Sequence, residues 1–255
     1  MSVSKVDYGP LVKGRLYNLT VYRYCPYQCV YCWSWRVPLF RTRVQRGKYD
    51  PVEAASKIPY GNTILISFTS DPFPPAEREE KRTRSVLEAL ADKHYACPRG
   101  RLDGRVLVLT KNPGLCVERD LDLFVGDTWL GSTVITLREG VVKELEPRAP
   151  PASERLAALK TAKGYNIKTF LSIEPIIPSA STDLCELVEK TADYVDFYIL
   201  GALNYARQLG FNYTRRELQR FYRENIPPVL ELLEQLGKKH HVKRELREHL
   251  EEAVD

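Results

Sequence analysis

The sequence predicts an α/β protein, a partial (βα)6 TIM-like parallel barrel with a C-terminal helical extension. Two observations support this fold class. Short apolar runs alternate with amphipathic runs along most of the 255 residues, as in successive β–α units. Most of the apolar runs are nearly continuous, which is typical of parallel strands buried on both faces. A complete eight-stranded barrel needs about 250 residues by itself. An incomplete barrel of six units therefore fits better, with a doubly wound open sheet as the alternative.

The expected strands lie within residues 1–212, which we assign to the barrel domain. They are rich in aromatic and β-branched side chains, which favour extended backbone. In chain order the six strands are Leu16–Tyr24, Thr63–Thr69, Arg105–Thr110, Trp129–Thr136, Lys168–Ile173 and Tyr194–Leu200.

The helices expected between these strands have recognisable ends. A helix over Pro51–Lys57 follows Asp50, whose carboxylate can cap its first turn. A helix over Ser153–Lys163 begins with Ser153 as its cap and stops at Gly164. The other expected helices are Glu77–Lys93, Ser181–Thr191 and Thr214–Arg223.

Residues 213–255 are assigned to the helical extension. Val242, Leu246 and Leu250 recur every four residues, so Lys238–Asp255 is expected to be one amphipathic helix. We expect this helix to pack across the barrel or to form a dimer contact, and the protein to be a monomer or a homodimer. The histidines of the tail are expected to be surface residues, because no carboxylate or cysteine completes a metal site beside them.

Composition places the chain among ordinary globular proteins, with 44% hydrophobic and 28% charged residues. A net charge of +5 permits contact with nucleic acid or an acidic partner without requiring it. No apolar stretch is long enough to span a membrane, and no apolar signal segment follows Met1, so a cytoplasmic protein is expected. Met1 is the only methionine and charged residues are abundant, which indicates a thermophilic source.

Cys25, Cys29 and Cys32 form a C-x3-C-x2-C motif directly after the first strand. Three thiolates this close can bind one iron–sulfur cluster, but they are one short of the usual four ligands. The remaining iron would be open to a substrate or cofactor, which favours catalysis. A structural zinc site is the alternative, and it needs four protein ligands. The nearest further candidates, His94 and Cys97, lie about sixty residues away and form no second close pair.

The other cysteines, Cys97, Cys116 and Cys185, are expected to be buried free thiols. A disulfide among them is the alternative, because the cytosol of hyperthermophiles tolerates disulfides.

Polar residues lie at or just after the carboxyl end of each expected strand, except in the fourth, which Ser132 and Thr133 interrupt. Because active sites of parallel α/β folds lie at that edge, we expect these residues to surround one site together with the cysteines. Local turn bonding is the competing explanation for each of them taken singly. They are Thr69, Ser70, Asp71, Lys111, Ser132, Thr133, Glu174 and Asn204.

The cysteine motif after the first strand of a six-unit barrel resembles the radical S-adenosylmethionine (radical SAM) superfamily. Within it, residues 16–205 look most like the spore photoproduct lyase-like group. The further segments that carry this likeness are Phe68–Pro72, Leu109–Lys111, Glu146–Pro151 with Glu154–Leu156, and Ser172–Pro178. The resemblance implies a [4Fe-4S] cluster bound by Cys25, Cys29 and Cys32, with S-adenosylmethionine (SAM) chelated to the open iron. It also implies reductive cleavage of SAM to a 5′-deoxyadenosyl radical that abstracts hydrogen from a substrate.

The resemblance also implies roles for individual residues. Tyr31 would lie near the adenine ring, and Lys111 would pair with the SAM carboxylate. Thr69, Ser70 and Asp71 offer acceptors for the amino group. Ser132 and Thr133 are suited to the ribose hydroxyls, and Glu174 and Asn204 to ribose or substrate. For Lys111 a solvated position at the rim is the alternative, and for Tyr31 simple packing around the cluster.

One residue departs from the lyase pattern. Phe68 stands where the lyase has a cysteine that donates a hydrogen atom, and a phenyl ring has no transferable hydrogen. We therefore expect that this protein does not repair spore photoproduct. The remaining cysteines and the tyrosines are the alternative donors.

A basic segment, Arg36–Lys48, follows the cysteines, with Trp33 and Trp35 beside it. Basic and aromatic side chains together can bind phosphates and stack on bases. The same charges can dock an acidic electron donor of the ferredoxin or flavodoxin type, and a solvated loop is the third reading. Nucleic acid is therefore one candidate substrate, and a protein or a small molecule is the alternative. A zinc-stabilised nucleic-acid-binding protein without catalysis is the second hypothesis. The basic residues are Arg36, Arg41, Arg43, Arg46 and Lys48.

Overall fold

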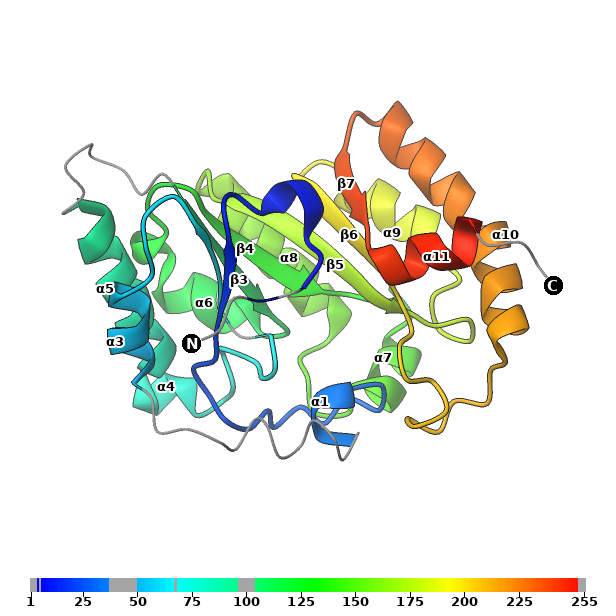
Figure 1. Ribbon diagram of the computed structural model, residues 1–255, viewed down its shortest axis with the longest axis horizontal. Coiled ribbons are helices and arrows are strands. Elements are labelled where there is room, and N and C mark those ends of the chain that lie inside the picture. Colours follow the sequence, from blue (N-terminus) through cyan, green and yellow to red (C-terminus); the bar gives the residue numbers. More distant parts are fainter. Residues whose placement is uncertain (1–3, 5, 37–49, 67, 96–103, 252–255) are drawn as a thin grey trace.

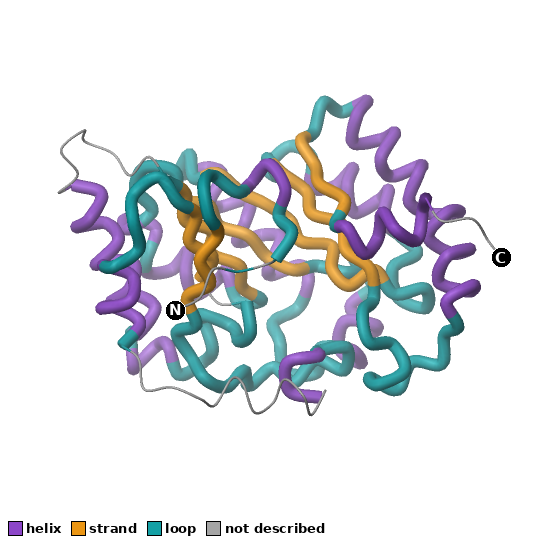
Figure 2. The backbone as a smooth tube through the Cα atoms, viewed as in Figure 1, coloured by secondary structure: helices purple, strands orange, loops and turns teal. Residues whose placement is uncertain are grey.

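A computed structural model describes residues 4, 6–36, 50–66, 68–95 and 104–251. Seven parallel strands form a single sheet in the order β1-β2-β3-β4-β5-β6-β7. The sheet curves into a half-barrel, with the larger helices on its outer side (Figures 1 and 2). The predicted partial TIM-like α/β barrel is therefore confirmed.

The strands are β1 (Leu16–Leu19), β2 (Thr63–Ile66), β3 (Arg105–Thr110), β4 (Thr128–Thr133), β5 (Lys168–Ile176), β6 (Phe197–Ala202) and β7 (Lys239–Val242). The helices are α1 (Trp33–Arg36), α3 (Pro51–Ser56), α4 (Glu77–Glu80), α5 (Arg82–Tyr95), α6 (Pro113–Arg119), α7 (Glu139–Leu145), α8 (Ala152–Gly164), α9 (Leu184–Thr191), α10 (Arg215–Gln235) and α11 (Arg244–Glu251). Two 3-10 turns are η1 (Gly9–Leu11) and η2 (Leu121–Leu123).

The seventh strand is the main difference from the sequence prediction. The expected single helix over Lys238–Asp255 is wrong, because Lys239–Val242 is extended and pairs in parallel with Phe197–Leu200 of β6. An unpaired β6 would expose a row of backbone donors and acceptors, and β7 satisfies them. The four-residue spacing that suggested a helix is a local pattern, and this long-range pairing overrides it.

The expected helices agree in place but differ at their ends. Asp50 caps α3, with its Oδ1 accepting from the amide of Val52 at 2.8 Å. Ser153 does not cap α8. Instead, the amides of Ala152 and Ser153 donate to the Glu139 carboxylate of α7, at 3.1 and 2.7 Å. The Glu139 carboxylate therefore caps the N-terminus of α8, the role that was predicted for the Ser153 hydroxyl.

The expected helix over Glu77–Lys93 is divided in two. Lys81 adopts a left-handed conformation with φ of 51°, which ends α4 before α5 begins. By contrast, α10 is longer than expected. Thr214 and Glu217 form a capping box at its start, and the helix continues through Pro227 and Pro228.

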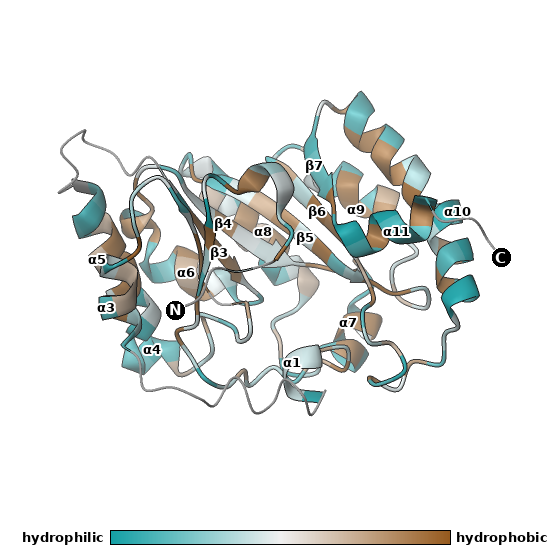
Figure 3. Ribbon diagram, in the orientation of Figure 1, coloured by the Kyte–Doolittle hydropathy of each residue, from teal (hydrophilic) through white to brown (hydrophobic). Residues whose placement is uncertain are grey.

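Alternating strand residues separate two hydrophobic clusters. Ile64 and Ile66 face the outer helices, whereas Leu65 faces the interior of the half-barrel. The N-terminal segment lies against the interior of the half-barrel (Figure 1). Its Tyr8 and Leu11 pack among the inward-facing strand residues. Figure 3 shows the hydrophobic residues concentrated on the strands and on the helix faces turned toward them. The N-terminal segment thus closes one end of the half-barrel and leaves the other end for a site.

Asp127, just before β4, binds four side chains at the amino ends of the strands. Its carboxylate accepts from Arg105 at 2.9 Å, Lys168 at 2.9 Å and Trp129 Nε1 at 2.7 Å. Lys13 completes the group at 2.7 Å. These contacts stabilise the end of the barrel opposite the cysteines.

In the described part of the chain, no helix combines the length and the apolar character that crossing a bilayer requires.

Candidate functional site

A cavity of about 610 Å³ opens at the carboxyl ends of the strands. This volume lies within the range of small-molecule and cofactor sites. Its walls come from the loop after β1, from the ends of β2 to β6, from the N-terminal segment and from the start of α11. The predicted residues that line it are Cys25, Cys29, Tyr31, Cys32, Thr69, Ser70, Asp71, Lys111, Thr133, Glu174 and Asn204. Ser132 is fully buried beside the cavity, and its hydroxyl donates to the carbonyl of Thr110 at 2.7 Å.

The cysteine loop is held by contacts with its own backbone and with α7. The indole Nε1 of Trp35 donates to the Cys29 carbonyl at 3.3 Å, and the Val30 amide donates to the Leu145 carbonyl at 2.8 Å. Cys29 is buried, while Cys25 and Cys32 are partly exposed to the cavity. Burial raises the pKa of Cys25 to about 12.

The donor set suits a cluster better than one zinc ion. Three thiols face one cavity, yet no three His, Cys, Asp or Glu side chains in the described ranges lie close enough to share a single ion. Ligands of one zinc must all approach within about 2.3 Å of it, whereas cluster cysteines bind different irons. Cys116 and Cys185 are free thiols, buried and half-buried respectively, and Cys97 lies outside the described residues.

Asp71 connects the ends of β2 and β3. One oxygen accepts from Thr110 Oγ1 at 2.6 Å and from the Phe73 amide at 2.8 Å, while the other accepts from the Lys111 amide at 2.7 Å. Burial raises the pKa of Asp71, although these hydrogen bonds oppose the shift. The carboxylate therefore fixes the backbone from which Lys111 enters the cavity.

Lys111 and Tyr31 share one buried partner that the sequence did not single out as a site residue. Glu146, just after α7, accepts a hydrogen bond from the Tyr31 hydroxyl, and its Oε1 lies 3.3 Å from Lys111 Nζ. Its other oxygen pairs with Arg155 of α8. Burial opposes ionisation of Glu146, but Lys111 and Arg155 outweigh it and lower the pKa of the carboxyl. We call these four residues the Glu146 cluster.

Another part of the cavity wall carries a second ion pair, in which Lys243 is buried and Glu174 is half-buried. Lys243, just after β7, places Nζ 2.6 Å from Glu174 Oε2 and 4.8 Å from the ring centroid of Tyr8. The Tyr8 hydroxyl is buried and has no hydrogen-bond partner within the described residues. Sequence reasoning missed Lys243 because it missed the strand before it. Recognising β7 would have identified Lys243 by the same strand-end rule that identified Lys111.

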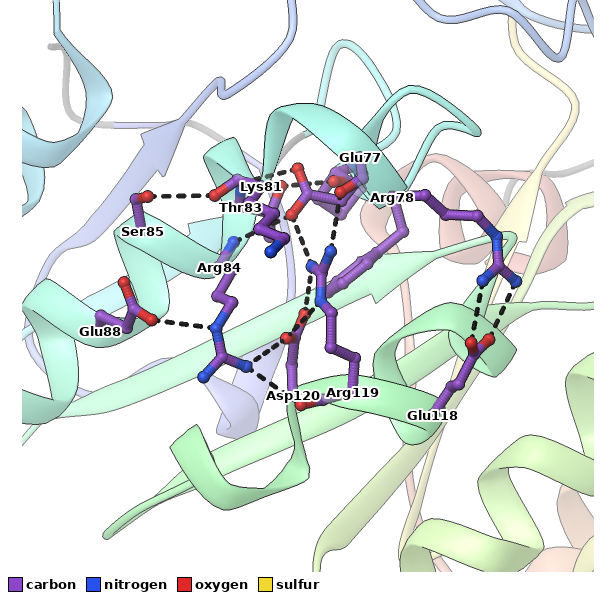
Figure 4. A network of polar contacts seen from close by, with 12 residues as sticks. Glu77, Arg78, Lys81, Thr83, Arg84, Ser85, Glu88, Glu118, Arg119 and Asp120 are labelled. Carbon is purple, nitrogen blue, oxygen red and sulfur yellow. Dashed lines mark hydrogen bonds and ion pairs between the residues drawn. The ribbon is translucent and has the colours of Figure 1, made fainter.

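A polar network outside the cavity links Glu77 of α4 with Arg119 of α6 (Figure 4). The buried Glu77 carboxylate accepts from the Tyr22 hydroxyl at 2.5 Å and from Arg119 at 2.7 Å. The backbone carbonyl of Tyr22 in turn accepts from the Ser70 hydroxyl on the cavity wall. The network therefore joins α4 and α6 to the chain that enters the cysteine loop.

The basic segment is described only at its beginning. Arg36 is exposed, stacks 5.4 Å from the Trp35 ring centroid and donates to the Val30 carbonyl at 2.9 Å. The other basic residues of the prediction, Arg41, Arg43, Arg46 and Lys48, lie outside the described residues.

Two sequence relatives span much of the chain, although no protein-family profile matches it. An uncharacterized protein of Methanocaldococcus jannaschii is 27% identical over 229 residues, which cover 87% of this chain and 81% of that protein. An uncharacterized protein of Acidianus two-tailed virus is 29% identical over 199 residues, 73% of this chain and 60% of the viral protein. This chain thus spans less than two thirds of the viral relative.

Solved structures share the fold at low sequence identity. A spore photoproduct lyase variant with bound AdoMet and dinucleoside spore photoproduct has a TM-score of 0.65 at 17% identity, covering 94% of this chain and 78% of the lyase. Streptococcus suis SuiB bound to S-adenosylmethionine has a TM-score of 0.61 at 13% identity, covering 93% of this chain and 53% of SuiB. This chain therefore spans about half the length of SuiB. It shares its fold with both proteins, and the predicted resemblance to the spore photoproduct lyase-like group is confirmed at the level of the fold.

Proposed function

We propose that this protein is a radical SAM enzyme that holds a [4Fe-4S] cluster through Cys25, Cys29 and Cys32. The observation that carries the proposal is that these three thiols line the same cavity as Lys111 and Tyr31. Two proteins with the same fold, SuiB and a spore photoproduct lyase variant, have been crystallised with SAM bound. When bound, the cluster and SAM supply a 5′-deoxyadenosyl radical that can abstract hydrogen from a substrate.

The residues around the cavity match the groups of SAM. Lys111 offers a positive charge to the carboxylate, and the Tyr31 ring offers a flat surface to adenine. Thr69 and Thr133 line the cavity and are suited to the amino group and the ribose. Asp71 and Ser70 have their oxygens engaged by protein groups, so their contribution would be to position the strand ends.

The substrate would occupy the part of the cavity bounded by Glu174, Lys243 and Tyr8. Phe68 lines the same cavity and packs 5.6 Å from the Trp33 ring, so it offers no hydrogen donor there. We therefore do not extend spore photoproduct repair to this protein. Nucleic acid is our proposed substrate class, supported by the dinucleoside bound to the lyase and by the exposed Arg36 that stacks on Trp35.

A peptide substrate is the second candidate, because SuiB has been crystallised with its precursor peptide SuiA. We further propose that a ferredoxin- or flavodoxin-type protein reduces the cluster, guided by the basic segment. Salt-dependent binding of single-stranded nucleic acid that weakens on charge reversal at Arg41 and Arg43 would favour the nucleic-acid substrate.

The decisive experiment is anaerobic reconstitution with iron and sulfide, followed by reduction with dithionite in the presence of SAM. We expect broad visible absorption that bleaches on reduction, and 5′-deoxyadenosine detected by mass spectrometry. Cys29→Ala should remove both signals, whereas the matched Cys185→Ala on α9 should keep them. Intact SAM beside a verified cluster would refute the proposal. One bound zinc without iron or sulfide would favour the zinc-stabilised alternative.

A further inference from the structure

Glu146 lies behind the cavity wall and contacts two residues that form it. Its side chain is buried, with 1% of the residue exposed, and it does not line the cavity itself. The Tyr31 hydroxyl donates to its Oε1, and the Lys111 ammonium lies 3.3 Å from the same oxygen. Lys111 Nζ also lies 5.4 Å from the centroid of the Tyr31 ring. One carboxylate oxygen thus sets the mutual placement of a lysine and an aromatic ring.

The Glu146 cluster contains two cations and one carboxylate, and the Asp71 carboxylate lies beside it, bonded to the Lys111 amide. Lys111 and Arg155 contribute two positive charges, and Glu146 contributes one negative charge. Arg155 is buried, and its guanidinium also donates to the carbonyls of Thr133 and Pro150, at 3.0 and 2.7 Å. Arg155 is therefore bound to the scaffold, and Lys111 is the cation that can meet a ligand.

We propose that Glu146 is a positioning residue that sets how strongly Lys111 binds the carboxylate of SAM. This inference rests on the proposed function. Glu146 and the SAM carboxylate compete for the same ammonium, so the protein carboxylate limits the affinity for that one group of the ligand. Because Glu146 also holds the Tyr31 hydroxyl, it keeps the ring and the ammonium at a spacing suited to one ligand molecule.

Competition between Glu146 and SAM predicts that SAM affinity rises when Glu146 is neutralised, whereas a purely structural role of Glu146 predicts that it falls. If Glu146 loses its charge, Lys111 loses its protein counter-ion and becomes more available to a ligand carboxylate. The affinity for SAM should then rise relative to a ligand that lacks only the carboxylate. A variant that merely loosens the fold would weaken both ligands by the same factor.

The test compares SAM with decarboxylated SAM, which keeps the adenosine, the sulfonium and the amino group. Dissociation constants for both are measured by anaerobic calorimetry on the cluster-loaded protein, wild type and Glu146→Gln. We expect the preference for SAM over decarboxylated SAM to increase by about fivefold or more, the low end of coupling between interacting sites. The matched control is Glu139→Gln, on the helix α7 that precedes Glu146, which loses the α8 cap but does not touch Lys111.

The preference should be unchanged in the Glu139 control. If Glu146→Gln folds poorly, the double variant with Arg155→Gln removes one charge of each sign, and it should show the same increase. Circular dichroism verifies folding of each variant. An unchanged or reduced preference in folded Glu146 variants would refute the role of Glu146 while leaving the proposed function intact. No SAM binding by the cluster-loaded wild type would refute both.

Discussion

Replacing Lys243 with methionine tests what the seventh strand contributes to the site. Methionine keeps most of the apolar stem of the side chain but removes the ammonium that lies 2.6 Å from Glu174. The Lys243 side chain is 5% exposed and that of Glu174 is 23% exposed, so the variant leaves a largely buried carboxylate without its counter-ion.

The expected cost follows from that burial. Breaking a fully buried ion pair from one side costs about 3–5 kcal/mol. Water can reach Glu174 in part, so we expect the free energy of unfolding to fall by about 2–3 kcal/mol. For a chain of this size, that loss lowers Tm by roughly 5–10 °C.

Urea denaturation followed by circular dichroism measures the loss, and a double-mutant cycle separates the pair from the packing. Lys243→Met, Glu174→Gln and the double variant are compared with wild type. We expect the double variant to be more stable than the sum of the single losses predicts, by about 1–3 kcal/mol. The matched control is Lys190→Met, whose surface pair with Glu186 on α9 should contribute less than about 1 kcal/mol.

Additive losses in the cycle would refute the reasoning, because they would mean that Lys243 and Glu174 do not interact. A Lys243→Met variant no less stable than the Lys190 control would be equally damaging. Either result would show that Lys243, at the end of β7, does not stabilise Glu174 on the cavity wall.

Three further predictions concern the frame around the site. Burial opposes ionisation of Asp127, but the hydrogen bonds from its four partners outweigh burial and lower its pKa. The ionised carboxylate therefore stabilises the folded state above about pH 4, and this stabilisation is lost as the pH falls further. Asp127→Asn should therefore lower the free energy of unfolding by about 2–3 kcal/mol at pH 7. Acid denaturation curves should show this difference from wild type shrinking as the pH falls, and a difference that does not change with pH would contradict the prediction. Gly131→Ala should cost about 1–3 kcal/mol in urea unfolding, because its new Cβ would lie 2.3 Å from the Phe170 ring, and an unchanged midpoint would contradict that crowding. Tyr22→Phe should cost about 1.5–3 kcal/mol by removing the hydroxyl bound to Glu77, measured by thermal unfolding, and wild-type stability would show that the bond contributes nothing.

The alternation of buried strands and helices could be predicted from the sequence because each element leaves a local signature. Arg105–Thr110 was predicted to the residue, since an apolar run between polar ends needs no knowledge of its neighbours. Asp50 was identified as a cap for the same reason, because the bond it makes lies within three residues. The position of Lys111 on the cavity wall followed from the strand-end rule alone.

Contacts between distant residues could not be predicted in this way. The strand Lys239–Val242 has no strong local preference, and its pairing with β6 gives it a defined conformation. Ser153 was a reasonable cap by composition, but a carboxylate from the preceding helix takes that role. Ser132 was expected on the cavity wall because it is a polar residue interrupting the fourth strand, yet its side chain is fully buried beside the cavity.

The sequence by itself determined the cysteine loop, the parallel half-barrel and the edge of the sheet where the site lies. These depend on spacing and periodicity, which act over a few residues. Only the tertiary structure decided which groups stand behind and opposite the predicted ones. Glu146 contacts Tyr31 across 115 residues of chain, and Lys243 contacts Glu174 across 69. Such pairs form because a curved parallel sheet brings its strand ends together, and a buried charge placed there needs a partner from wherever the chain supplies one.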